Sequence, residues 1–362
     1  MRPVRVLVVE DSFVMRQLIS DILQADPQIE IVGQAKDGLE ALLKIPELKP
    51  NCVTLDLKMP GLQGAETLSR IMDECPTPVV ILSAHSKEDA DVTIRCLANG
   101  AVGFVLKPSG ELSLDIDRVQ AQLIQEVKMA SRVPVARIQS LLAKRPTGKP
   151  HKITRARPLV VIGASTGGPQ TLEFILASLP EDFPAPILVV QHVPSLFFTH
   201  SLAERLKSRL ALEVRVPEDG EDLEAGTVYL APAGFHMTVE NRTTHPGHRP
   251  PQDTSRWAGA VIRLAEASPE VLGPSIDITM QSVAHLTGGE CIGIILTGIG
   301  HDGLEGMRTI KKLGGRTIAQ DETALIFGMP KAVIDATLAD TVLPANRIAH
   351  ALMEGIPVDQ RM

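Results

Sequence analysis

The sequence has few aromatic residues and no long hydrophobic run. Phe, Trp and Tyr make up 3% of its 362 residues, which argues against a nucleic-acid or carbohydrate reader built on stacked rings. The net charge of -7 also argues against a duplex binder. No apolar stretch reaches the roughly 18 residues that cross a bilayer. The N-terminal apolar stretch ends at Glu10, too early for a signal peptide.

Cysteine is also scarce. The four cysteines, Cys52, Cys75, Cys96 and Cys291, lie far apart and form no C-x-x-C pair, which argues against a disulfide framework or a structural zinc site. Hydrophobic residues at 44% and charged residues at 22% are ordinary for a globular chain. We therefore expect a soluble cytoplasmic protein, a monomer that inserts into no membrane and binds no nucleic acid.

The length predicts two domains, since single domains typically have about 100 to 150 residues. Residues 131–157 carry 8 basic side chains and no acidic one, together with several prolines, which is typical of an extended tether. We predict domains over 1–125 and 158–355 and a flexible basic linker over 126–157. A helix from about Leu112 is expected to fade inside the linker, which is extended after Ile138. Docking of this tether on an acidic partner stays an alternative.

Short apolar runs alternate with helical periods in the first domain. This alternation predicts an α/β fold with a doubly wound parallel sheet. The predicted strands are Arg5–Val9, a weak strand at Glu30–Gly33, Cys52–Leu55, Pro78–Leu82 and Gly103–Leu106.

Functional side chains follow these strands, and the carboxyl ends of parallel strands meet at one edge of a sheet. Glu10 and Asp11 follow the first strand, Asp56 the third, Ser83 the fourth and Lys107 the fifth. Crowded carboxylates repel one another unless they share a hard cation, and oxygen ligands suit Mg²⁺. With the metal bound, Asp56 could attack a phosphoryl group whose oxygens Lys107 and Ser83 hold.

Four motifs together resemble a response-regulator receiver domain of the flavodoxin-like fold. They are V-V-E-D-S at 8–12, L-D-L-K-M-P-G at 55–61, L-S-A at 82–84 and F-V-L-K-P at 104–108. The resemblance implies that Asp56 is the phosphoacceptor and that Glu10, Asp11 and Asp56 bind Mg²⁺. It also implies that Ser83, Phe104 and Lys107 are the switch residues and that a histidine kinase is the phosphodonor.

The second half repeats the alternation of strands and helices, with predicted strands at Leu159–Ile162, Ile187–Val190, Gly226–Leu230 and Cys291–Leu296. The turn G-A-S-T-G-G-P at 163–169 joins a strand to a helix. It lacks the lysine and the spacing of a nucleotide-binding loop. Ser165 in this turn is therefore a candidate nucleophile at a helix N-terminus.

A base and an orienting carboxylate complete this candidate site. His192 directly follows a strong strand, and Asp302 lies in the loop L-T-G-I-G-H-D-G at 296–303. Parallel strand ends meet at one edge, so Ser165, His192 and Asp302 are predicted to form a triad. His301 is a rival base.

These motifs, with A-P-A-G-F-H-M at 231–237, P-S-I-D at 274–277 and I-A-Q-D-E at 318–322, resemble the chemotaxis protein-glutamate methylesterase (CheB) family over nearly the whole chain. The resemblance implies a Rossmann-like catalytic domain that hydrolyses glutamyl methyl esters on chemoreceptor helices, deamidates glutamines there, and uses no cofactor for ester hydrolysis. It makes Ser165 the nucleophile, His192 the base and Asp302 the orienting group. The backbone N–H of Ile299 becomes an oxyanion donor, with Thr166 and Gly167 nearby.

The sequence departs from the family pattern in two places. Ile299 stands where methionine is usual, and an apparent insertion separates His248-Arg249-Pro250 from Ser275. The insertion, 251–274, contains an amphipathic stretch, Trp257–Ala267, which we predict to be a surface helix, with a substrate-contacting lid as the alternative. Two other functions compete: a phosphorylation-controlled binding protein with an unused esterase fold, and a nucleotide switch at 163–168.

Overall fold

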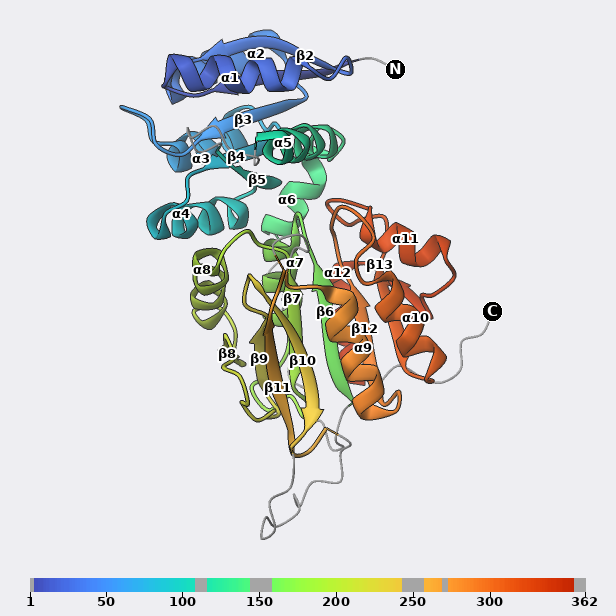
Figure 1. The fold of residues 1–362 in the computed structure, drawn as a ribbon. Helices are drawn as coiled ribbons and strands as arrows, with labels where there is room; N and C mark the ends of the chain where they lie inside the picture. The colour runs from blue at the N-terminus through green and yellow to red at the C-terminus, as the bar shows by residue number, and fades with distance from the viewer. Residues whose placement is uncertain (1–2, 108–115, 144–157, 243–256, 269–272, 355–362) are drawn as a thin grey trace. The chain divides into compact units, whose positions relative to one another are not determined.

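The computed structural model describes residues 3–107, 116–143, 158–242, 257–268 and 273–354. The chain divides into two compact units, Met1–Lys144 and Arg145–Met362, and each has its own parallel sheet (Figure 1). No helix within the described ranges is long and apolar enough to cross a membrane. The prediction of two doubly wound α/β domains is confirmed.

The first unit has a five-stranded parallel sheet in the order β2-β1-β3-β4-β5. β3 and β4 are buried along their whole length, as expected for strands covered on both faces. The predicted bounds agree with the observed ones within two residues, including the weak second strand. The strands are β1 (Val4–Val9), β2 (Ile29–Ala35), β3 (Cys52–Asp56), β4 (Val79–Ser83) and β5 (Gly103–Leu106).

Helices cover both faces of this sheet (Figure 1). α1 contacts α5 on one face, and α2, α3 and α4 contact one another in series on the other. Side chains define several helix starts: Ser12 accepts the N–H of Met15 at the start of α1, and Ser86 accepts that of Asp89 at the start of α4. The helices are α1 (Phe13–Gln24), α2 (Gly38–Leu48), α3 (Gly64–Glu74), α4 (Lys87–Ala98), α5 (Ile116–Ala130) and α6 (Val135–Ala143).

The predicted linker is helical in its first part. α5 continues to Ala130, and α6 follows after a short turn. Ile138 is buried and lies against Gly100 of the first unit. The prediction of an extended chain after Ile138 is therefore wrong as far as Ala143, because α6 has an apolar partner surface that its own sequence does not reveal. Residues 112–115 and 144–157 lie outside the described residues.

The second unit has a seven-stranded parallel sheet in the order β14-β13-β12-β6-β7-β9-β8. The four strands that the sequence predicted occupy its centre, β12-β6-β7-β9, and their bounds agree within two residues. The strands are β6 (Leu159–Ala164), β7 (Ile187–Gln191), β8 (Glu213–Arg215), β9 (Thr227–Leu230), β12 (Cys291–Ile295), β13 (Arg316–Gln320) and β14 (Thr341–Leu343).

α9, α10 and α11 pack together against β6, β12 and β13, while α7 contacts α12. α9 and α10 make the most extensive helix-to-helix contact, a feature that matters for the candidate site. The helices are α7 (Gly168–Leu176), α8 (Leu196–Lys207), α9 (Ile276–Thr287), α10 (Leu304–Lys312), α11 (Met329–Asp335) and α12 (Ala345–Glu354).

A two-stranded antiparallel hairpin, β10 (Phe235–Asn241) and β11 (Ala260–Glu266), packs on α9. The prediction of a helix at Trp257–Ala267 is therefore wrong. Trp257, Ala260 and Ile262 belong to the buried core of this unit, and alternate residues of β11 face it. A short amphipathic stretch is compatible with both the helical and the strand period of apolar residues. Pairing with β10 makes this one a strand. Residues 251–256 and 269–272 lie outside the described part.

Candidate functional sites

The carboxyl ends of β1, β3 and β5 form an acidic pocket around one lysine. Glu10 and Asp56 are buried, and Asp11 beside them is exposed. Lys107 Nζ lies 2.8 Å from Glu10 Oε2 and 2.8 Å from Asp56 Oδ1. The structure therefore brings together the carboxylates and the lysine that the sequence predicted at this edge.

The pocket fits a divalent cation. Burial raises the pKa of Glu10 and of Asp56, although Lys107 partly offsets the effect in both. Burial by itself would lower the pKa of Lys107, but its ion pairs with Asp56 and Glu10 outweigh burial and raise it. One carboxylate oxygen from each of Glu10, Asp11 and Asp56 lies within 4.8 Å of the others. Such crowded oxygens are stabilised by a hard cation, and Mg²⁺ accepts this ligand set.

Ser83 ends β4 and is fully buried. Its Oγ accepts a hydrogen bond from Thr93 Oγ1 at 2.9 Å, which links the strand end to α4. Phe104 lies half-buried on β5, the neighbouring strand. Of the predicted switch residues, Ser83 adjoins Lys107, whose N–H donates to the Ser83 carbonyl at 2.8 Å. The sheet register pairs Phe104 with Ile81, two residues before that edge.

The sequence analysis missed Asp89, a buried carboxylate in the first turn of α4. Lys58 lies two residues after Asp56, and its Nζ is 3.0 Å from Asp89, which also accepts from Ser86 Oγ at 2.6 Å. Asp89 therefore ties the loop that follows Asp56 to α4. The only sequence signal for this residue was its place three positions after a helix-capping serine.

Ser165 lies in the turn between β6 and α7 of the second unit. Its N–H donates to the carbonyl of Thr297 at 3.0 Å. Gly167 caps α7 with φ of 77°, a left-handed conformation that favours glycine. A Cβ on Gly298 would stand 2.8 Å from the Cβ of Ser165, so the loop after β12 approaches the serine as closely as glycine permits.

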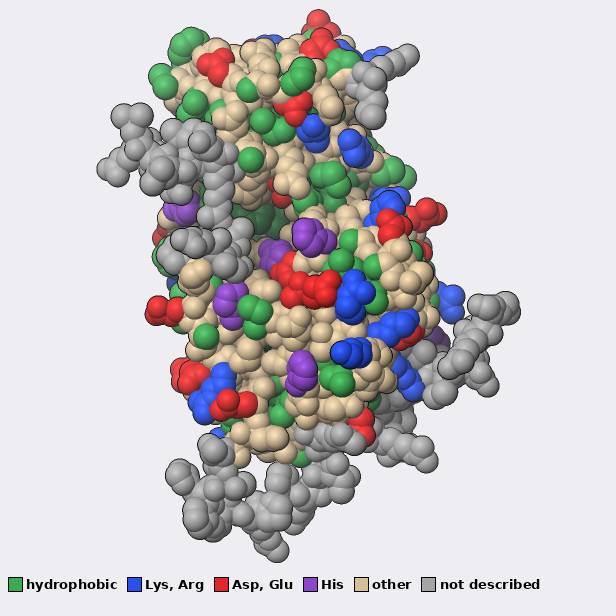
Figure 2. Space-filling view, turned by 45° about the vertical axis from the view of Figure 1, so that its right-hand side comes forward, with side chains coloured by type: hydrophobic (Ala, Val, Ile, Leu, Met, Phe, Trp, Pro, Cys, Tyr) green, Lys and Arg blue, Asp and Glu red, His purple; other side chains and the backbone are tan. Residues whose placement is uncertain are grey.

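His192 follows β7, the strand next to β6. Its N–H donates to the carbonyl of Ala164 at 3.0 Å, which places it beside the Ser165 turn. Its Nε2 lies 2.9 Å from Asp302 Oδ2. His192, and not the rival His301, pairs with Asp302; the side chain of His301 is exposed. On the face drawn in Figure 2, histidine side chains reach the surface beside acidic ones.

Asp302 is held at the N-terminus of α9, where helix N–H groups favour negative charge. Its carboxylate accepts the N–H groups of Ile276 and Asp277, both at 2.9 Å, and the hydroxyl of Ser275 at 3.3 Å. Burial by itself would raise the pKa of Asp302, but the hydrogen bonds from His192 and from these N–H groups lower it to about 2.

Asp277 completes a reciprocal arrangement between two helices. Its carboxylate accepts the N–H of Gly306 at 2.6 Å, in the first turn of α10, while Asp302 from the loop before α10 caps α9. Burial raises the pKa of Asp277, and the charge of Asp302 adds to the rise. The motif P-S-I-D at 274–277 carried only the family resemblance, and no local sequence pattern indicated that its backbone N–H groups bind the Asp302 carboxylate.

Because the pKa of Asp302 is depressed, its ionised form stabilises the fold above about pH 4, and this contribution is lost as the pH falls toward 2. Between about pH 4 and pH 2 the unfolding free energy of wild type should fall because Asp302 becomes protonated. In Asp302→Asn, which has no carboxylate here, we expect this fall to be smaller by about 2 kcal/mol. Urea denaturation followed by fluorescence of Trp257, the single tryptophan, measures it. The exposed Asp182→Asn is the control. Identical acid profiles for Asp302→Asn and wild type would contradict the assignment.

The predicted oxyanion donors come from two segments that lie beside Ser165. Thr166 and Gly167 follow it in the same turn, and the Thr166 carbonyl accepts from Thr297 Oγ1 at 2.9 Å. Ile299 directly follows Gly298, which touches Ser165, and precedes Gly300, whose φ is 92°. The structure thus brings Ile299 close to the serine from the neighbouring strand end.

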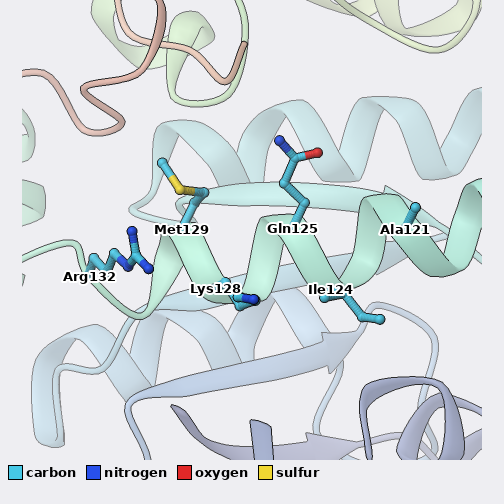
Figure 3. Close-up of a pocket in the computed structure, with 6 residues that line it drawn as sticks. All are labelled: Ala121, Ile124, Gln125, Lys128, Met129 and Arg132. Carbon is cyan, nitrogen blue, oxygen red and sulfur yellow. The ribbon is translucent and has the colours of Figure 1, made fainter. Parts of the chain in front are cut away.

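A separate cavity of about 200 Å³ lies along α5 of the first unit (Figure 3). Gln125 and Met129 point to one side of the helix, and Lys128 points to the other, where it pairs with Asp26 at 2.9 Å. None of the predicted site residues lines this cavity. It is lined by Ala121, Ile124, Gln125, Lys128, Met129 and Arg132.

An acidic pocket on one parallel-sheet unit and a Ser, His and Asp set on another are the layout of a response regulator with an α/β catalytic domain. Comparison with protein families agrees: residues 6–116 match the response regulator receiver domain, and residues 160–352 match CheB methylesterase. The chain belongs to the CheB methylesterase family.

Two curated relatives match nearly the full chain, and both are named protein-glutamate methylesterase/protein-glutamine glutaminase. The protein of Thermotoga maritima is 42% identical over 361 residues, covering 98% of each chain. That of Geobacillus kaustophilus is 41% identical over 361 residues, covering 98% of this chain and 99% of the relative. The crystal structure of the Thermotoga maritima CheB methylesterase catalytic domain covers 55% of this chain and 99% of its own, at 40% identity and a TM-score of 0.49.

Proposed function

We propose that this protein hydrolyses glutamyl methyl esters on the cytoplasmic helices of methyl-accepting chemoreceptors and releases methanol. One observation carries the proposal: His192 pairs with Asp302 at 2.9 Å and adjoins the Ser165 turn through the pairing of β6 with β7. This pairing supports Ser165 as nucleophile, His192 as its base and Asp302 as the group that orients the base. The names of the full-length relatives support the substrate.

The contact between His192 and Asp302 assigns roles to the two imidazole nitrogens. Nε2 of His192 faces Asp302, so Nδ1 is the nitrogen that accepts the hydroxyl proton as Ser165 Oγ attacks the ester carbonyl carbon. The ionised Asp302 stabilises the resulting imidazolium. His192 then passes the proton to the leaving oxygen, so that methanol departs and an acyl-serine forms. Water attacks the acyl-serine by the same route in reverse, which frees glutamate and restores Ser165.

The tetrahedral intermediate carries its negative charge on the former carbonyl oxygen. The backbone N–H of Ile299 donates to this oxygen, with Thr166 and Gly167 at the N-terminus of α7 close by. The same route deamidates glutamine when ammonia replaces methanol as the leaving group. Proton transfer from His192 to the leaving group matters more for deamidation than for ester hydrolysis, because an amide nitrogen leaves only once it is protonated.

The first unit receives a phosphoryl group from a histidine kinase of the chemotaxis type. Asp56 is the acceptor, since it faces Lys107 at 2.8 Å and shares the acidic pocket with Glu10 and Asp11. Glu10, Asp11 and Asp56 would hold Mg²⁺, which when bound would supply positive charge beside the phosphoryl oxygens. Lys107 and Ser83 hold those oxygens. Phe104 changes its orientation together with Ser83, which carries the change from the pocket to the receiver surface.

Phosphorylation of Asp56 raises the rate of ester hydrolysis by the second unit. The unphosphorylated receiver keeps that rate low. A phosphoryl group adds charge and hydrogen-bond acceptors beside Ser83 and Lys107, which changes the relative stability of two receiver conformations. A shift of about 2.7 kcal/mol raises the conformation that permits hydrolysis from 1% to about half of the molecules. A modest difference in phosphate contacts between the two states is therefore sufficient.

Methanol release tests the proposal directly. Full-length protein with Mg²⁺ and acetyl phosphate is mixed with membranes that carry receptors methylated with a labelled methyl group. We expect labelled methanol to appear, and mass spectrometry to find free glutamate at the methylated positions. The exposed Ser208→Ala serves as a control that keeps wild-type rates. A folded, phosphorylated protein that leaves the receptor esters intact would contradict the methylesterase activity and favour a binding role.

A further inference from the structure

Gln191 has no part in the reaction as proposed, yet it touches two of its residues. It ends β7, directly before His192, and its side chain is 2% exposed. Its Nε2 donates to the carbonyl oxygen of Ser165 at 2.9 Å and to the carbonyl oxygen of His192 at 2.9 Å. One amide group therefore spans the backbones that carry the nucleophile and the base.

We propose that Gln191 is a positioning residue that holds Ser165 and His192 at their working separation. The inference rests on the proposed function, since it deepens the account of the same site. An amide NH₂ group has two hydrogens, and here each has its own acceptor. If these hydrogen bonds are lost, the Ser165 carbonyl keeps only the N–H of Gly168 from its own turn, at 2.7 Å, and both carbonyls lose the donor that joins the end of β7 to that turn.

The other side of the serine is held by a neighbouring strand. Ser165 N–H donates to the Thr297 carbonyl at 3.0 Å, and Thr297 N–H donates in turn to Gln320 Oε1 at 3.0 Å. On the β7 side, the side chain of Gln191 provides the matching link to the Ser165 carbonyl. The backbone of Ser165 is thus fixed from both sides, and only the Gln191 link also reaches the base.

Gly168 supports this reading, because its lack of a side chain leaves room for the glutamine. A Cβ on Gly168 would stand 1.8 Å from Gln191 Oε1 and 2.8 Å from its Cδ. Gly168 is not among the glycines with positive φ, so the backbone conformation does not require glycine there. Gln191 and the Cβ of Ala164, which would stand 2.9 Å away, together exclude a larger residue at the start of α7.

The test compares Gln191→Leu with wild type in the full-length, phosphorylated protein. Leucine has a similar size and donates no hydrogen bond. We expect kcat for methanol release to fall by about ten- to a hundredfold, as small misplacements of reacting groups do. We expect KM to stay within about twofold, because a buried side chain does not touch the receptor. The control is Thr287→Val, which removes another buried hydrogen bond of this unit, to the Val283 carbonyl at 2.8 Å.

A second measurement needs no receptor. Phenylmethanesulfonyl fluoride sulfonylates an activated serine with loss of fluoride, and intact mass gives the rate at Ser165. We expect Gln191→Leu to lower the sulfonylation rate by a factor similar to its effect on kcat. We expect Thr287→Val to leave both the sulfonylation rate and kcat at wild-type values. If Gln191→Leu does not give folded protein by Trp257 fluorescence, Gln191→Met takes its place, with the same expectation.

These measurements distinguish failure of the proposed methylesterase function from failure of the positioning role of Gln191. A wild type that is sulfonylated at Ser165 but releases no methanol contradicts the proposed function, and the sulfonylation rates still test Gln191. Rates in Gln191→Leu within twofold of wild type, or no lower than in Thr287→Val, would overturn the positioning role. A rise in KM with unchanged kcat would also overturn it, since that pattern belongs to substrate binding.

Discussion

Ser165→Ala and His192→Ala are each expected to lower methanol release from methylated receptors by roughly a thousandfold or more. The first removes the atom that forms the acyl intermediate. The second removes the group that takes and returns its proton. Because they act as one unit, the double variant is expected to be scarcely slower than either single variant. The measurement is initial-rate release of labelled methanol at saturating receptor.

Asp302→Asn is expected to retain more activity than either of these variants, since it disturbs the orientation and charge of His192 and leaves the base in place. His301→Ala serves as the matched control, because His301 is exposed and adjoins Asp302. Full activity in His192→Ala together with loss in His301→Ala would reassign the base. Additive losses in the Ser165 and His192 double variant would mean that the two residues work in separate steps.

Asp56→Asn is expected to abolish phosphorylation and, with it, the activation of ester hydrolysis. Asparagine keeps the shape of the side chain but lacks the carboxylate that attacks the phosphoryl group. With labelled phosphodonor and Mg²⁺, wild type should take up one phosphoryl group per chain and the variant none. Removing Mg²⁺ with a chelator should likewise stop uptake in wild type, because the carboxylate pocket then repels the donor.

The control for Asp56→Asn is Asp73→Asn, an exposed carboxylate on α3 of the same unit. It is expected to keep wild-type phosphorylation. The unphosphorylated hydrolysis rate of Asp56→Asn should equal that of unphosphorylated wild type, which shows that the second unit is intact. Label uptake by Asp56→Asn at wild-type stoichiometry would show that another residue is the acceptor.

Much of the acidic pocket was predictable from the sequence because each part depends on a short local signal. An apolar run marks each strand, and the pocket residues directly follow β1, β3 and β5 or end them. Parallel strands collect such residues at one edge whatever the rest of the chain does. Ser165 and His192 follow β6 and β7 in the same way, so their place at neighbouring strand ends was also predictable.

Two segments were mispredicted because their neighbours decide their structure. Trp257–Ala267 is amphipathic at both the helical and the strand period, and pairing with β10 makes it a strand. The residues after Ile138 are basic and were predicted to be extended, but the apolar face of α6 packs beside Gly100. In both cases the deciding contact comes from residues distant in the chain.

The sequence by itself determined the two units, the central strands and the residues that the strand ends collect. Only the tertiary structure decided what holds those residues in place. Asp302 owes its low pKa to His192, 110 residues earlier in the chain, and to the N-terminus of α9, 26 residues earlier. Gln191 likewise reaches Ser165 across 26 residues. A strand end is a local property, whereas the donor that satisfies a buried carboxylate or carbonyl is known only once the helices and sheets have packed.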